Sequence, residues 1–161
     1  MAVRHEEGTE RRLIWVVAVL GVAVLGLVGW VAYDAFAPTA PNGELQELVD
    51  AYHQAWNDHD GEAFLALVTD DYVMETAQGG PNDAIAQAAN VVEMAESDWT
   101  VVVIGEPLWW EGTDDAYYVS FANRLTSTVY PEEGYEGMSM MKIVEVDDTY
   151  LVARHIYYGR Y

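Results

Sequence analysis

Residues 44–56 read ELQELVDAYHQAW, and their apolar side chains recur at steps of three and four residues. This spacing gathers the apolar side chains on one face of an α-helix and the acidic and amide side chains on the other. The polar run NDHDG at residues 57–61 interrupts the pattern, and Asp60 is placed to cap a second helix. The apolar side chains of this second helix are Phe64, Leu65, Leu67 and Val68.

A short strand and a third helix are predicted after the acidic pair Asp70-Asp71. Residues 72–76 (YVMET) have the composition of a strand, and the turn sequence GGPN at residues 79–82 ends it. A helix is then expected from Asp83 to about Ala95. Its expected apolar stripe consists of Ile85, Ala88, Ala89, Val92 and Met94.

From Trp99 onward the hydrophobic period changes to two residues, which is typical of strands. The adjacent Trp109 and Trp110 must point to opposite faces of their strand, so we expect one of them at a partner surface, at the membrane interface or beneath the 127–134 connection. Expected strands cover residues 100–104 with a continuation at 108–110, then 116–126, 138–146 and 150–158. Three helices followed by consecutive antiparallel strands predict an α+β domain over residues 44–161, with the helices packed on one face of a curved sheet.

An uncharged run of 21 residues, LIWVVAVLGVAVLGLVGWVAY, occupies residues 13–33. A helix needs about 20 apolar residues to cross the hydrocarbon core of a bilayer, whereas the apolar part of a signal peptide has about 7–15. We therefore predict a transmembrane helix. The alternative is a cleaved signal peptide, for which Ala35-Phe36-Ala37 resembles a cleavage site, although Pro38 after it disfavours cleavage.

Basic residues orient the predicted membrane helix. The tail 1–12 contains three arginines, and the next basic residue of the chain is Arg124. Because basic residues remain on the cytoplasmic side, we expect a single-pass protein of the cell membrane with a cytoplasmic N-terminus. A Pro- and Gly-containing tether at residues 34–43 then leads to an extracytoplasmic domain at residues 44–161.

The chain after the predicted membrane helix is strongly acidic. Residues 34–161 contain four basic and 24 acidic side chains, which account for the whole formal net charge of −20. Such a surface repels phosphates, so nucleic-acid binding is excluded. It fits a solvated acidic coat or, alternatively, a surface for cations or basic proteins. The chain has no cysteine, which excludes disulfides and thiolate chemistry.

Two segments of the domain resemble a known family. Residues 48–73 resemble the opening of the nuclear-transport-factor-2-like (SnoaL-like) superfamily, in which a helix with a Tyr and an Ala-Trp pair leads through a polar turn into a second helix and a strand. Residues 152–158 (VARHIYY) are similar to its last strand. The resemblance covers about residues 44–160 and implies a cystatin-like cone, in which the sheet and the long helix enclose an apolar pocket. Members use this pocket for binding, for isomerisation or hydrolysis, or only for packing.

Ketosteroid-isomerase-like members of the superfamily imply where catalytic residues would lie. Tyr52 matches their hydrogen-bonding Tyr, but the position of their general-base Asp falls on Thr76, whose hydroxyl is a poor proton acceptor near neutral pH. Glu75 is one residue away and, by alternation, on the opposite face of the strand. The position of their second acidic hydrogen-bond donor falls near Met140 or Met141, which are apolar. The resemblance therefore implies an incomplete isomerase site.

Histidines offer a further acid–base arrangement. In one hypothesis His53 and His155 approach the pocket and, with Glu75, form an acid–base pair or hold a metal ion; the favoured interpretation is that they are ordinary hydrogen-bonded core histidines. The catalytic candidates are therefore Tyr52, Glu75 and His155. We expect no metal ion and no cofactor.

Seven side chains of the domain suit a small-molecule pocket, although the same types of side chain also fill cores. These ligand-binding candidates are Tyr52, Trp56, Trp99, Phe121, Met141, His155 and Tyr157. The favoured hypothesis is a non-enzymatic accessory module that binds a partner protein or a small apolar ligand. The alternatives are a small-molecule enzyme with isomerase- or hydrolase-like chemistry and a purely structural domain with a filled cone. A homodimer is expected only by analogy with similar domains.

Overall fold

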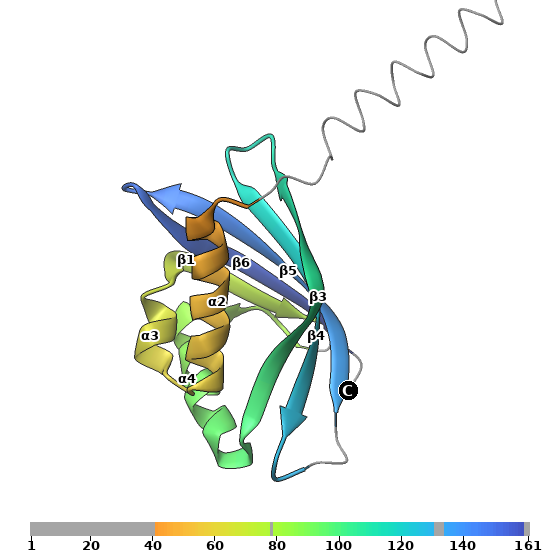
Figure 1. Cartoon of the computed structure of the whole chain (residues 1–161). Coiled ribbons are helices and arrows are strands. Elements are labelled where there is room, and N and C mark those ends of the chain that lie inside the picture. Colours follow the sequence, from red (N-terminus) through yellow and green to blue (C-terminus); the bar gives the residue numbers. More distant parts are fainter. Residues whose placement is uncertain (1–40, 78, 131–133, 160–161) are drawn as a thin grey trace, which may run out of the picture. The chain divides into compact units, whose positions relative to one another are not determined.

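The computed structural model describes residues 41–77, 79–130 and 134–159 (Figure 1). The predicted membrane helix at 13–33, the tail before it and most of the tether lie outside these residues. No helix within the described ranges is long and apolar enough to cross a membrane.

Capping side chains begin the helices of the domain. Asn42 accepts a hydrogen bond from the Leu45 N–H, Asp60 accepts bonds from Glu62 and Ala63, and Asp83 accepts one from Ala86. Each carboxylate or amide thereby satisfies backbone N–H groups that have no partner within the helix. The predicted cap at Asp60 is correct, but the second helix is shorter than expected, because Val68 already begins the first strand. The helices are α2 (Gly43–Asn57), α3 (Gly61–Leu65), α4 (Ala84–Glu93) and the 3₁₀ turn η1 (Met94–Ser97).

A six-stranded sheet of order β2-β1-β6-β5-β4-β3 forms the other layer. Neighbouring strands are antiparallel except for β1 and β6, which are parallel. The purely antiparallel sheet expected from the sequence is therefore wrong at this one pair, because the β3 to β6 meander ends on a strand that runs in the same direction as β1. The strands are β1 (Val68–Thr76), β2 (Asn82–Asp83), β3 (Trp99–Glu111), β4 (Tyr117–Ser127), β5 (Tyr135–Val146) and β6 (Thr149–Gly159).

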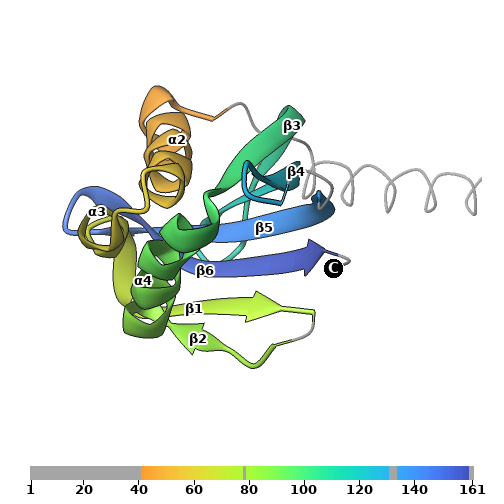
Figure 2. The same cartoon turned by 90° about the horizontal axis from the view of Figure 1, so that it is seen from below.

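All of the helices lie against one face of the curved sheet, as Figures 1 and 2 show from two directions. This arrangement confirms the predicted α+β cone for the described part of the chain. Asn57 at the end of α2 bonds both the N–H and the carbonyl of Val101, which fixes the helix to the edge strand β3. The core between the layers includes Leu45, Val49, Tyr52, Phe64, Tyr72, Val119, Phe121, Met141, Ile143 and Val152.

The strand expected in two pieces around Pro107 is one strand with an irregular register. Its pairing with β4 shifts between Ile104 and Leu108, and Gly105 there has a φ of 75°. Proline has no N–H to donate, so it is tolerated at a bulge or on an edge strand, and β3 provides both. Beyond the bulge Trp109 is buried, whereas Trp110 stacks on Tyr118 with ring centroids 5.6 Å apart. The cover of Trp110 therefore comes from the neighbouring strand.

The apolar stripe expected on the third helix is wrong in phase. Ile85 is 76% exposed, and the buried face of α4 instead contains Ala84, Gln87, Ala88 and Val91. A Cβ on Gly61 would lie 2.9 Å from the Ala88 carbonyl oxygen, so α3 and α4 approach each other closely at this point. Such an approach requires the absence of a side chain at Gly61, which lies against the Ala88 backbone and the Val92 side chain.

Paired substitutions on α4 test this phase. We expect Val91→Ala to lower the free energy of unfolding by about 2 kcal/mol, because it leaves a gap in a packed core. Ile85→Ala removes more atoms from the same helix, yet we expect a change of less than about 0.5 kcal/mol because the side chain faces solvent. Urea titration of the full chain in detergent micelles measures both changes. Equal losses would contradict the observed orientation of the helix.

Candidate binding pocket

A pocket of about 180 Å³ lies between α2, α4 and the inner face of the sheet. An engineered cavity of about 150 Å³ holds benzene, whereas drug-sized ligands occupy about 300–1,000 Å³. The pocket therefore has room for about one ring. Its lining consists of Tyr52, His53, Trp56, Met74, Thr76, Asn82, Gln87, Asn90, Met94, Val101, Asn123, Leu125, His155 and Tyr157.

A chain of buried hydrogen bonds runs behind this pocket. The Tyr52 hydroxyl lies 2.8 Å from the Tyr72 hydroxyl and 3.0 Å from Nδ1 of His155. Nε2 of His155 lies 2.8 Å from Oγ of Ser139, which also accepts a 2.7 Å bond from the Asn123 side-chain amide. The chain thus connects α2 with strands β1, β6, β5 and β4.

Burial keeps the side chains of this hydrogen-bond chain uncharged. Desolvation and, to a smaller extent, nearby His53 together lower the pKa of His155 to about 3. Desolvation also raises the pKa of Tyr52 far above its ordinary value, although a hydrogen bond with Tyr72 acts in the opposite direction. Two proton arrangements satisfy a neutral His155: either Nδ1 accepts from Tyr52 while Nε2 donates to Ser139, or both directions are reversed. Both ring nitrogens are occupied in each case.

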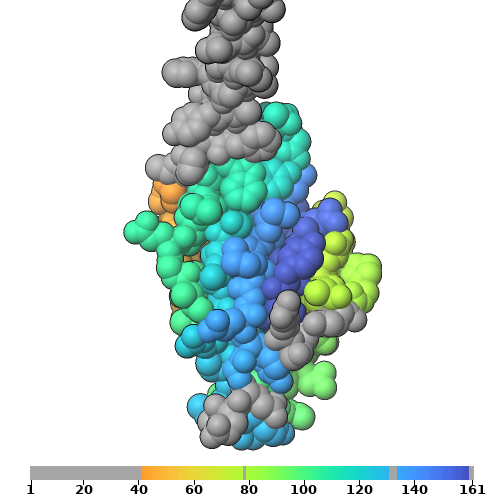
Figure 3. All heavy atoms as spheres, turned by 90° about the vertical axis from the view of Figure 1, so that its right-hand side faces the viewer, coloured from red at the N-terminus to blue at the C-terminus, as the bar shows by residue number. Residues whose placement is uncertain are grey.

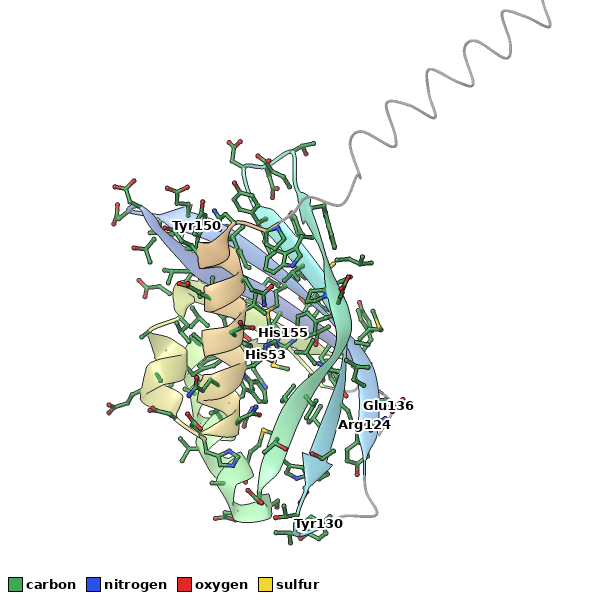
Figure 4. All side chains as sticks on the ribbon, in the orientation of Figure 1. His53, Arg124, Tyr130, Glu136, Tyr150 and His155 are labelled. Atoms are coloured by element: carbon green, nitrogen blue, oxygen red, sulfur yellow. The ribbon has the colours of Figure 1, made fainter. Side chains whose placement is uncertain are left out.

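His53 differs from His155 because one of its nitrogens has no partner. Nδ1 lies 2.8 Å from the carbonyl oxygen of Val49, one turn earlier in α2. Nε2 is buried and has no hydrogen-bond partner among the described residues. The ring is held edge-on against Phe121, with centroids 5.0 Å apart. Burial lowers the pKa of His53, partly opposed by the Val49 carbonyl and by Asp50. Figure 4 shows His53 and His155 in the space between α2 and the sheet.

Asn123 offers the second buried polar atom without a partner. Its side-chain N–H group bonds Ser139, while Oδ1 is buried and has no hydrogen-bond partner within the described ranges. Alternation along β4 places Asn123 on the same inner face as Val119 and Phe121. The sequence pattern did contain this signal, because an amide interrupts an otherwise apolar face. An amide is not among the residue types typical of acid–base chemistry, so the pattern alone did not identify Asn123 as a site residue.

The structure brings together only some of the residues expected in the pocket. Tyr52, Trp56, His155 and Tyr157 line it. Phe121 and Met141 are buried but do not line it, and Trp99 packs instead against Tyr130 and Tyr135. These positions follow from strand alternation and from the distance of Trp99 along β3.

Glu75 is separated from the other catalytic candidates. It forms an ion pair with Arg154 of the neighbouring strand β6, on the outer face of the sheet. Thr76 lines the pocket, but its hydroxyl already accepts a bond from the Gly79 N–H. The acid–base set of Tyr52, Glu75 and His155 is therefore not assembled. Within the described residues, no three side chains of His, Asp or Glu converge to hold a metal ion, so a metal site with His53 is not assembled either.

Comparison with solved structures identifies the fold. An NTF2-like protein with a cystatin-like fold from Novosphingobium aromaticivorans superposes with a TM-score of 0.61 and 13% identity, covering 71% of this chain and 79% of that one. A ketosteroid isomerase-like protein from Erwinia carotovora superposes with a TM-score of 0.58 and 16% identity, covering 73% and 95%. A protein of unknown function from Mycobacterium tuberculosis gives 0.62 and 16%, covering 73% and 70%. The described domain thus has the NTF2-like, cystatin-like fold.

Sequence comparison adds no closer assignment. No protein-family model matches the chain, and no curated protein matches it. At these low identities the structural likeness is a likeness of fold, and activity has to be argued from the pocket itself.

The buried His155 predicts a pH dependence of stability. The unfolded chain binds a proton at this site below about pH 6.5, whereas the folded chain does not until about pH 3, so stability falls as the pH decreases through this window. Between about pH 7 and about pH 5 we expect the wild type to lose about 2 kcal/mol more than His155→Asn. Urea titrations of both proteins measure the difference, in which the shared carboxylate effects cancel. Parallel pH profiles would contradict a neutral, desolvated His155.

Proposed function

We propose that this protein is a membrane-anchored, extracytoplasmic module of NTF2-like fold that binds a small uncharged organic molecule in the pocket beside α2. The observation that carries the proposal is the unpartnered Nε2 of His53, buried in the wall of that pocket. A buried polar atom without a partner costs about 1–3 kcal/mol, and native proteins retain few of them. A ligand that bonds this atom supplies the missing interaction.

The uncharged nature of the ligand follows from the lining. Among the described residues, none of those that line the pocket is an Asp, Glu, Lys or Arg. An ion entering it would lose its hydration without gaining a counter-ion, which is unfavourable in a buried site. The strong negative charge of the domain also disfavours the approach of anions.

Binding is favoured over catalysis for a related reason. An efficient general base has a pKa near the working pH, but burial lowers the pKa of both pocket histidines. Both ring nitrogens of His155 are also hydrogen-bonded. The position of the general base in ketosteroid-isomerase-like proteins corresponds to Thr76, whose hydroxyl is a poor proton acceptor. We therefore propose a non-enzymatic module.

The membrane location rests on the sequence. The uncharged run at 13–33 has the length of a membrane helix, and the arginines before it favour a cytoplasmic N-terminus. The pocket would then lie outside the cytoplasmic membrane, at the end of a short tether.

A ligand screen tests the binding function. We expect uncharged single-ring molecules such as phenol to raise the unfolding temperature of the full chain in nanodiscs, because they bind only the folded state. Benzoate and benzylammonium serve as charged comparisons and should have no effect. Val101→Phe fills the pocket and should abolish the response, whereas Val102→Phe, on the neighbouring exposed position, should retain it. An identical response in both variants would assign the effect to the lipid and contradict the proposal.

A second candidate function, self-association, concerns the outer face of the sheet. Figure 3 shows strands β3 to β6 side by side on this face. Large apolar side chains are exposed there, including Leu108, Met138 and Tyr158, of which Tyr158 is 61% exposed. The ion pairs of Arg124 with Glu136, Lys142 with Asp114 and Arg154 with Glu75 lie around them.

Charge favours a second copy of this chain as the occupant of that face. Every basic residue within the described ranges takes part in one of these ion pairs, so this face is close to neutral while the remainder of the domain is acidic. Two copies therefore repel each other least when they meet through it. We propose a homodimer through this sheet face.

Sedimentation of the full chain in density-matched detergent tests the dimer. We expect Met138→Asp to convert dimers to monomers, because it places an unpaired charge in an apolar contact. Ile85→Asp introduces the same charge at a more exposed position on α4 and should leave the dimer intact. Dimers in both variants would show that another part of the chain associates.

A further inference from the structure

Two of the unpartnered polar atoms on pocket-lining residues, His53 Nε2 and Asn123 Oδ1, are hydrogen-bond acceptors. Nδ1 of His53 faces the Val49 carbonyl, and a carbonyl oxygen has no proton to give. The proton of the neutral imidazole must therefore be on Nδ1, and Nε2 presents a lone pair. The side chain is only 8% exposed, so this lone pair is directed into the protein.

The Asn123 amide is oriented in the same sense. Its N–H group donates to Ser139, which leaves Oδ1 buried with its lone pairs unused among the described residues. Asn123 is 3% exposed, and the adjoining His155 and Ser139 fix the amide from behind. Both unpartnered acceptors belong to residues that line the same pocket.

Three side chains of the wall that can donate, those of Tyr52, Asn82 and Asn90, are engaged elsewhere. The Tyr52 hydroxyl, which would otherwise be the obvious donor to a ligand, is held between Tyr72 and His155. The indole N–H of Trp56 lies outside hydrogen-bond geometry but close enough to Tyr52 to lower the pKa of its hydroxyl. The side-chain amides of Asn82 and Asn90 donate to Gln87.

We infer that the pocket selects neutral molecules of about one ring that donate two hydrogen bonds, such as a dihydroxybenzene or a small aromatic alcohol, over ketones, ethers and hydrocarbons of the same size. This inference rests on the proposed binding function and specifies its ligand class. Donation to His53 Nε2 and Asn123 Oδ1 satisfies both buried acceptors, whereas a carbonyl ligand would place a third lone pair beside them. The selection follows the same rule by which sites built around a buried polar group reject analogues that lack its partner.

A series of four probes tests the selection. Benzene-1,2-diol, phenol, toluene and benzaldehyde are similar in size and present two donors, one donor, none, and an acceptor alone. Dissociation constants are measured by fluorescence titration of the full chain in nanodiscs, with Val101→Phe as the control for partition into lipid. We expect phenol to bind about tenfold more tightly than toluene, the diol more tightly than phenol, and benzaldehyde no better than toluene.

Substitution of either acceptor should reduce the selection without abolishing binding. In Asn123→Leu and in His53→Leu we expect the ratio between phenol and toluene to fall to about threefold or less, while toluene still binds. Binding of toluene thus shows that the pocket is intact in each variant. If one variant does not fold, the other variant and the wild-type series still test the selection for hydrogen-bond donors.

Each contrary result has a distinct meaning. Equal affinities for all four probes in the wild type would overturn the selection but leave the binding function standing. Tighter binding of benzaldehyde than of phenol would show that Asn123 presents its N–H group to the pocket, and would also overturn it. Binding of none of the four probes would overturn the proposed function together with this inference.

Discussion

The buried hydrogen-bond chain from Tyr72 through Tyr52 and His155 to Ser139 is the constraint on which the rest of the domain depends. Each of these polar groups is buried and has lost its hydrogen bonds to water. Each therefore destabilises the fold unless its neighbour lies within hydrogen-bond distance. The distances of 2.8, 3.0 and 2.8 Å along it therefore fix α2 relative to β1, β6 and β5. An entirely apolar core would allow α2 to slide by small amounts over the sheet, but this chain of hydrogen bonds does not allow it.

The same constraint explains why the catalytic candidates chosen by residue type do not make an active site. Tyr52 and His155 are the side chains expected to carry acid–base chemistry, yet their polar atoms are used to hold the layers together. The polar groups that remain for a ligand are those of His53, which lies beside this chain of hydrogen bonds, and of Asn123, which lies at its end. On α2 the structural role thus belongs to Tyr52, and the proposed ligand-binding role belongs to the next residue, His53.

Periodicity in the sequence was enough to predict the helices, most strands and the α+β cone, because the apolar face of α2 and the alternation in β4 are strong local signals. It also placed Glu75 and Thr76 on opposite faces of β1, as they are found. The phase of α4 could not be obtained in this way, since the close approach of Gly61 to Ala88 turns the face with Ala84 and Ala88 inward and leaves Ile85 exposed. The parallel pairing of β1 with β6 depends on contacts between segments that are distant in the sequence, and a local pattern does not predict such contacts. The free acceptor on His53 depends on a tautomer, which only the position of the Val49 carbonyl defines.

Charge divides the domain into three environments, and each limits what can bind there. The acidic surface keeps the domain soluble and repels anions, the outer sheet face is neutralised by its ion pairs, and the pocket contains no charged side chain. A ligand for the pocket must therefore be distinguished by hydrogen bonding and by shape alone. In a space of about 180 Å³ shape can separate ligands only by size, because few atoms fit. The direction of the hydrogen bonds to His53 and Asn123 then remains as the main source of discrimination, and it is set by the same network that holds α2 on the sheet.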